Sequence, residues 1–89
     1  MRTVLKKERS FKTSDINLAT TLYTLGVTLL GIEREDSHRC CFIFDETDDT
    51  LRAIKAYWRR ELALDPQSLL LNLKVLKARL YGERYETSN

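Results

Sequence analysis

The segment from Phe11 to Asp45 constrains the fold more than any other part of this 89-residue chain. A single phenylalanine between polar residues indicates a short edge strand at about residues 9–13. Ser14 is expected to cap a helix that runs to about Leu25, and Gly26 supplies the left-handed residue that ends it. This helix is expected to bury one side and expose the other: Leu18, Ala19, Leu22 and Leu25 against Asn17, Thr20, Thr21 and Thr24.

A β-hairpin follows this helix directly. Residues 27–35 are β-branched and aliphatic before they turn charged, and residues 39–45 alternate apolar side chains between two faces. Polar residues at 36–38 join the two runs. Because the first helix reverses the chain, strands one and two run parallel, and the third strand is expected between them, antiparallel to both. The hairpin therefore predicts a sheet of order 1-3-2 with helices on one face.

Two further helices complete the chain. Thr47 is expected to cap a helix with two aspartates in its first turn, ending near Leu62. Asp65 followed by proline marks the start of the last helix, which is expected to end at Tyr81 before a closing glycine, Gly82. The expected core stripes are Leu51, Ile54, Trp58 and Leu62, with Tyr57 at the margin, and then Leu69, Leu73, Leu76 and Leu80.

The element order is therefore β-α-β-β-α-α, and the expected class is α+β with a small antiparallel or mixed sheet of three strands. One domain is expected, because 89 residues leave no room for a second hydrophobic core. Its bounds are residues 9–82, between a flexible basic arm at 1–8 and a frayed tail at 83–89. An apolar leader and an apolar run of about 18 residues are both missing, which predicts a cytoplasmic protein with no membrane contact.

Charge is unevenly distributed although the formal net charge is only +2. Residues 1–12 carry five bases against one acid, residues 31–50 two bases against seven acids, and residues 51–84 eight bases against three acids. The molecule is therefore expected to place a basic arm and basic helices around an acidic hairpin end.

The residue types that carry catalysis or bind metals form no recognisable pattern. Cys40 and Cys41 are adjacent strand residues whose side chains diverge, and no second Cys/His pair completes four zinc ligands. His38 sits in the expected hairpin turn without a catalytic partner at a known spacing. The acids from Asp45 to Asp49 lack the central glycine of a calcium loop and suit the start of a helix. We therefore expect a non-enzymatic protein with no catalytic residue, metal or cofactor.

Bases on the last two helices form the one suggestive constellation. Successive cations on a helix can follow a phosphate backbone, and the basic residues 1–12 would add contacts. The alternative is a solvated helix face, supported by Asp48 and Arg52 four residues apart. Tyr57 and Trp58 are expected in the core rather than on a stacking platform. The expected nucleic-acid-binding residues are Arg52, Lys55, Arg59, Arg60, Lys74 and Lys77.

The last helix also carries a second apolar stripe on nearly the opposite side from its core stripe, formed by Leu71, Val75 and Ala78. A helix that is apolar on two faces is either sandwiched within its own fold or bound to something else. Three helices on one small sheet make full sandwiching difficult, so this stripe is expected to contact a second copy or a protein partner. The alternative function is therefore a protein–protein adaptor or inhibitor.

Several of these residues form a pattern that extends over about residues 9–82. It consists of Ser14, Asp15, Asn17, Leu18 and Ala19 at the first helix, Leu25 and Gly26 at its end, Phe42 and Phe44 in the strand, and Tyr57 and Trp58 in the next helix. In this pattern the chain resembles an uncharacterised family, a domain of unknown function found in small bacterial and phage-associated proteins. The resemblance implies a fold and a mobile-element context, and it carries over no activity, cofactor or catalytic residue.

Overall fold

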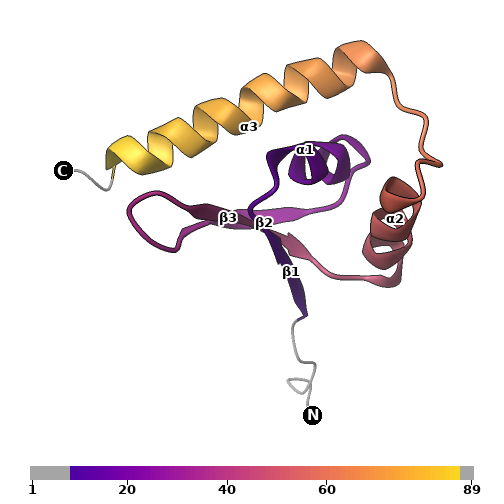
Figure 1. Ribbon diagram of the computed structural model, residues 1–89, viewed down its shortest axis with the longest axis horizontal. Coiled ribbons are helices and arrows are strands. Elements are labelled where there is room, and N and C mark those ends of the chain that lie inside the picture. The colour runs from indigo at the N-terminus through magenta and orange to yellow at the C-terminus, as the bar shows by residue number, and fades with distance from the viewer. Residues whose placement is uncertain (1–8, 87–89) are drawn as a thin grey trace.

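The computed structural model describes the backbone of residues 9–86 and the side chains of residues 9–82. Within that range the strands and helices follow in the predicted order (Figure 1). They are β1 (Ser10–Thr13), α1 (Ile16–Thr24), β2 (Leu29–Arg34), β3 (Cys40–Asp45), α2 (Asp48–Trp58) and α3 (Pro66–Glu86). The fold is therefore of the expected α+β class. The basic arm predicted at 1–8 lies outside the described residues, as do residues 87–89 of the predicted tail.

The strands form one antiparallel sheet in the predicted order β1-β3-β2. Phe11 of β1 pairs with Phe44 of β3, and Ile32 of β2 pairs with Phe42 from the other side. A register shift in β2 leaves Leu30 outside the regular ladder, where it is exposed. Because β3 is paired along both edges, its two phenylalanines are fixed at the centre of the sheet.

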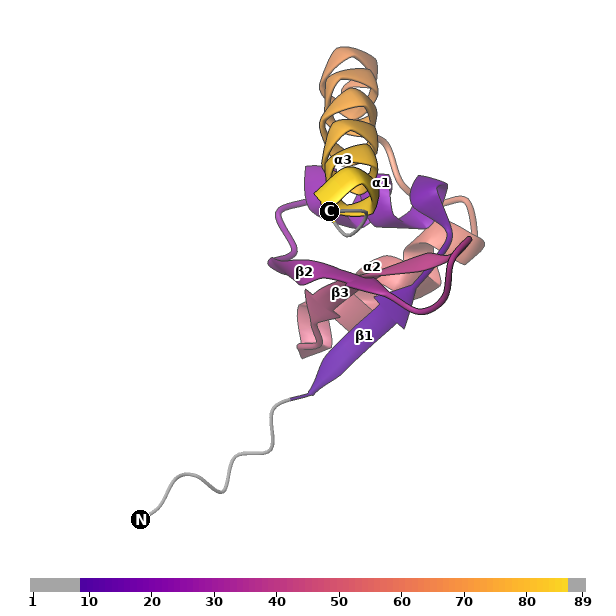
Figure 2. The same ribbon diagram turned by 90° about the vertical axis from the view of Figure 1, so that its left-hand side faces the viewer.

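The helices α1 and α3 cover one face of the sheet, whereas α2 packs beside α1 beyond the end of the sheet (Figures 1 and 2). The prediction that helices share one face is therefore right for α1 and α3. Leu80 packs against the core from the predicted stripe of α3. The buried core consists of Leu18, Ala19, Leu22, Phe42, Phe44 and Leu76.

The N-cap of α1 is Asp15 rather than the predicted Ser14. Its Oδ1 accepts hydrogen bonds from the backbone N–H groups of Asn17 at 2.9 Å and Leu18 at 3.3 Å. These bonds satisfy two of the N–H groups that a helix start leaves unpaired. At the other end Gly26 has φ +93°, the left-handed conformation predicted for the residue that ends the helix.

Thr20 and Thr21 face the core, contrary to the polar side expected for α1, and are 2% and 6% exposed. Each hydroxyl donates to the carbonyl four residues earlier, Thr20 to Ile16 at 2.7 Å and Thr21 to Asn17 at 2.9 Å. A threonine can be buried in this way because its own helix satisfies its polar group.

The helix α2 begins at the predicted cap, Thr47, which forms a capping box with Thr50. Thr50 is 1% exposed, and its hydroxyl donates to the carbonyl of Asp45 at 2.8 Å. This bond ties the start of α2 to the end of β3. The helix ends at Trp58, about one turn before the predicted end near Leu62.

The side of α2 that packs on the core differs from the predicted stripe. Leu51 and Trp58, expected inside, are 44% and 64% exposed. The hydroxyl of Thr50 holds that residue against β3, which turns its neighbour Leu51 about 100° toward solvent. Trp58 is turned outward in the same way, because Tyr57 packs on the core. The residues of α2 that contact the core are Ala53, Ile54 and Tyr57.

The helix α3 begins where Asp65 and Pro66 predict it. Asp65 Oδ2 accepts hydrogen bonds from the backbone N–H and the hydroxyl of Ser68, both at 2.8 Å. The hydroxyl and then the N–H of Ser68 lower the pKa of this carboxyl group. The predicted end at Tyr81 is wrong, because the helix continues to Glu86 and Gly82 lies inside it. A glycine ends a helix only where the chain turns, and one in a helix interior merely weakens it.

The burial of Leu76 (0% exposed) predicts that Leu76→Ala lowers the free energy of unfolding by about 2–5 kcal/mol, because it removes core contacts and leaves a cavity. Leu70→Ala is the matched control on the same helix, since Leu70 is 60% exposed, and it should change the free energy by less than about 0.5 kcal/mol. Urea denaturation followed by circular dichroism measures both values. Equal losses in the two variants would contradict this account of the core.

Candidate nucleic-acid interface

Three of the predicted cations, Arg52, Lys55 and Arg59, follow one another along the solvent side of α2 and its C-cap. Their spacings of three and four residues place them on the same helix face. All three are exposed, and that face lies opposite the residues of α2 that contact the core. Arg52 forms an ion pair with Asp49, whereas Lys55 and Arg59 form none with any described residue.

Trp58 lies beside this row of cations, three residues after Lys55 on an adjoining strip of the helix. Its indole packs edge-to-face against the ring of Tyr57, with ring centroids 5.0 Å apart and planes at 83°. Because Tyr57 contacts the core, this contact supports the indole while most of its surface stays accessible to solvent. The expectation that Trp58 belongs to the core is therefore wrong, and α2 presents an aromatic side chain next to cations.

The remaining predicted cations do not join this surface. Arg60 follows α2 in the left-handed conformation, with φ 60°. Lys74 is exposed on α3, and Lys77 lies with His38 and Arg39 near the β2–β3 turn, at the end of the molecule away from α2 (Figure 1). The predicted constellation is therefore divided between two separate surfaces.

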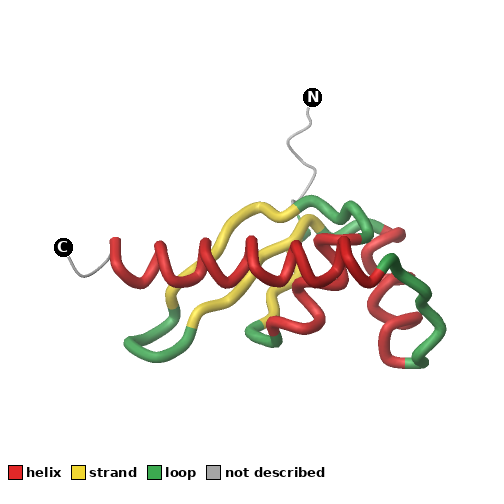
Figure 3. Tube along the Cα trace, turned by 90° about the horizontal axis from the view of Figure 1, so that it is seen from above, coloured by secondary structure: helices red, strands yellow, loops and turns green. Residues whose placement is uncertain are grey.

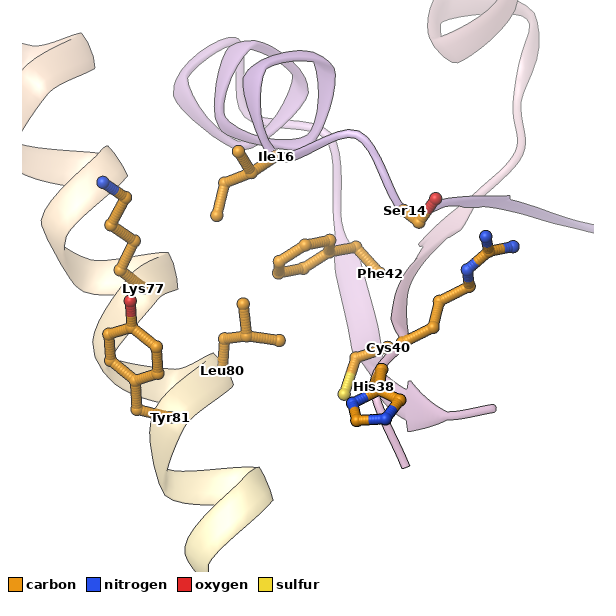
Figure 4. Close-up of a pocket in the computed structure, with 9 residues that line it drawn as sticks. Ser14, Ile16, His38, Cys40, Phe42, Lys77, Leu80 and Tyr81 are labelled. Carbon is orange, nitrogen blue, oxygen red and sulfur yellow. The ribbon is translucent and has the colours of Figure 1, made fainter. Parts of the chain in front are cut away.

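Lys77 belongs to a groove between α3 and the β2–β3 hairpin, which we call the hairpin groove, with a volume of about 370 Å³. Figure 4 shows Ile16, Phe42 and Leu80 gathered between Lys77 and Tyr81 on one side and His38 and Cys40 on the other. Ser14 and Arg39 complete the lining. Sequence reasoning missed this groove because its residues come from three separate segments of the chain.

The second apolar stripe of α3 lies on the surface, as its position opposite the core stripe predicts. Leu71 is 61% exposed, Val75 is half-buried and Ala78 is exposed. The neighbouring Leu70 is also exposed. This stripe is therefore not sandwiched within the described part of the fold.

The two cysteines have different surroundings, as their divergent strand positions predict. Cys40 is half-buried and lines the hairpin groove. Cys41 is buried on the other face of the sheet, where its thiol donates a hydrogen bond to Glu35 Oε2 at 3.0 Å. This hydrogen bond, and then burial, raise the pKa of the Cys41 thiol.

These surroundings predict that Cys41 is much less reactive than Cys40. At pH 8 we expect the Cys41→Ser variant, which keeps Cys40, to react with Ellman's reagent at least about tenfold faster than Cys40→Ser, because burial shields the Cys41 thiol from the reagent and its raised pKa lowers its thiolate fraction. In denaturing urea the two variants should react alike. Equal rates in the folded protein would show that Cys41 is not protected.

His38 and the acidic residues near it shape the hairpin turn. Asp36 Oδ1 accepts a hydrogen bond from the backbone N–H of His38 at 2.8 Å, which lowers the pKa of the Asp36 carboxyl group. Within the described residues no group of three or more His, Cys, Asp and Glu side chains could hold a metal ion. None of the helices that the structure describes has the length and apolar character needed to cross a membrane.

Comparison with known proteins identifies the chain at the level of a family. No curated protein and no solved structure matches it. Residues 8–82, which include all the strands and nearly all of the helical residues described above, match a family described as a domain of unknown function, DUF5659. Because this match spans most of the sequence, the chain belongs to the DUF5659 family.

Proposed function

We propose that this chain is a non-enzymatic module that binds single-stranded nucleic acid through the exposed side of α2. The observation that carries the proposal is the exposure of Trp58 (64%) beside the row formed by Arg52, Lys55 and Arg59. Cations spaced along a helix can each neutralise a phosphate, and an exposed indole can stack on an unpaired base. Duplex bases are already stacked on one another, so this combination favours a single strand.

The other cations have a lesser part in this proposal. Lys74 and Lys77 lie away from α2 and would add only long-range attraction for a polyanion. Arg60 directly follows α2 and adds an exposed positive charge near the row without belonging to it. The two free cysteines, which cannot pair with each other without strain, favour a reducing compartment, and we place the module in the cytoplasm.

The proposal predicts salt-sensitive binding that depends on α2. The triple variant Arg52→Glu, Lys55→Glu, Arg59→Glu should abolish binding to a labelled oligothymidylate in fluorescence anisotropy. For the unchanged protein, log Kd against log salt should have a slope of roughly 2, because each of three phosphate contacts on a single strand contributes about 0.7. Undiminished binding by the triple variant would refute the proposal.

A charge-matched control is available on α3. Lys74→Glu, Lys77→Glu, Arg79→Glu changes the net charge by the same amount at three exposed positions away from α2. We expect this variant to retain most of the binding. Equal losses in the two triple variants would mean that only the overall charge of the protein matters, and not a site on α2.

Trp58 offers a direct signal because it is the only tryptophan in the chain. Stacking predicts that an oligothymidylate quenches its fluorescence, and that Trp58→Ala weakens binding by about 1–3 kcal/mol. An RNA or DNA duplex should bind more weakly and quench less. Binding without quenching would place the nucleic acid elsewhere on the protein.

The exposed stripe of α3 favours a second function, the protein–protein contact. Leu71 is 61% exposed, and Leu71, Val75 and Ala78 follow spacings of four and three residues, as apolar residues do along a helix-packing seam. We propose that this stripe contacts a second copy of the chain or a protein partner. An adaptor or inhibitor would use the same surface.

This second candidate predicts that Val75→Glu converts a dimer to a folded monomer, because it places a charge in an apolar contact. Light scattering gives the mass and circular dichroism the fold. Gln67→Glu introduces the same charge at an exposed position of the same helix and should leave the mass unchanged. If the wild-type protein is a monomer at micromolar concentration, the homodimer hypothesis is excluded, and a different protein remains the only candidate partner for this stripe.

A further inference from the structure

The hairpin groove arises from the way α3 crosses α1 (Figure 1). The 21 residues of α3 extend about 32 Å, and the helix crosses α1, which supports only part of that length (Figures 1 and 2). The C-terminal half of α3 therefore passes beyond α1 and over the β2–β3 hairpin (Figures 1 and 3). No other described element fills the space beneath that overhang, and the groove lies there.

The floor of the groove is apolar and firmly held. Phe42 is 1% exposed and belongs to the core, and Ile16 and Leu80 pack against that core from α1 and α3. The three side chains come from different elements and point toward a common centre (Figure 4). A ligand in the groove would thus meet a preformed apolar surface, which is the usual character of a small-molecule site.

The rim of the groove is cationic. Arg39 of the hairpin and Lys77 of α3 line it, together with the hydroxyls of Ser14 and Tyr81, and among the residues whose side chains are described no carboxylate lines the groove. The positive charge of the rim contrasts with the adjoining hairpin, which carries most of the acids of residues 31–50.

The two acids closest in sequence to the rim are engaged elsewhere. Glu35 accepts the hydrogen bond from the thiol of Cys41 on the other face of the sheet. Asp36 accepts the backbone N–H of His38 within the turn. Neither carboxylate therefore enters the groove to compete for its cations.

We propose that the hairpin groove binds a small amphipathic anion, with its apolar body on Ile16 and Leu80 and its anionic head at Arg39 or Lys77. The volume of about 370 Å³ lies near the lower end of the range for small-molecule sites, about 300–1,000 Å³, so a compact ligand fits better than a macromolecule. This inference does not depend on nucleic-acid binding, because the groove and α2 lie at opposite ends of the molecule (Figure 1).

Decanoate, kept below its critical micelle concentration, is the probe for this site. In amide NMR spectra of the full chain we expect saturable shifts at Ile16, Cys40, Phe42 and Leu80 and none at Trp58. At least one of Arg39→Gln and Lys77→Gln should raise the dissociation constant at least about fivefold, which identifies the cation that holds the head. Lys74→Gln, which removes a cation from α3 outside the groove, should leave the constant unchanged.

Decanol tests the role of the anionic head, because it has the same chain without a charge. Weaker binding of decanol than of decanoate supports the proposal, and equal binding overturns the assignment of an anion site. No shifts in the groove, or equal dissociation constants for the wild-type protein and both glutamine variants, would overturn the proposal as a whole. The glutamine variants change exposed side chains, so loss of the fold will not mask the result.

Discussion

The burial of Phe42 and Phe44 at the centre of the sheet is the interaction on which the remaining structure depends. Both side chains lie on β3, which is hydrogen-bonded along both edges, and they are 1% and 0% exposed. The residues that cover them, Leu22 of α1 and Leu76 of α3, belong to elements that would not be stable alone. The position of α3 thus follows from one contact region near its middle, and the overhang that forms the hairpin groove is a consequence.

Most of the fold could be predicted because its signals are local. Alternating apolar residues in β3, the left-handed Gly26, and the pair Asp65 and Pro66 each specify backbone geometry within a few residues. The errors occur where two local solutions compete. Asp15 and Ser14 are both good helix caps, and the hydrogen bonds that Asp15 Oδ1 accepts from the first turn of α1 show which one the chain selects.

The candidate surfaces were less predictable because they depend on how elements rotate and meet. The bases of α2 could be assigned to one face from their spacing, yet the exposure of Trp58 follows from the bond between Thr50 and β3, which no helical wheel contains. A polar residue determined which apolar residues are buried. The hairpin groove could not be predicted from the sequence for a related reason, since it exists only where α3 extends past its contact with α1.

The orientation of α2 leaves Trp58 exposed and so lowers the stability that its burial would provide. A tryptophan side chain offers about 150–250 Å² of surface for burial, so leaving 64% of it exposed forgoes about 2–4 kcal/mol of stabilisation at roughly 25 cal/mol per Å². Burial of Tyr57 and Ile54 offsets part of that loss.

The face of the sheet opposite the helices differs from the exposed side of α2 in how its charges are paired. There Lys12 and Glu33 form an ion pair at 3.2 Å across the central strand, so neighbouring charges neutralise each other. On α2, Lys55 and Arg59 have no such partner among the described residues, and the indole of Trp58 lies beside them. Exposed cations next to an exposed aromatic ring suit a surface that binds an anionic, stackable partner, which is why α2 is the stronger candidate for the binding surface.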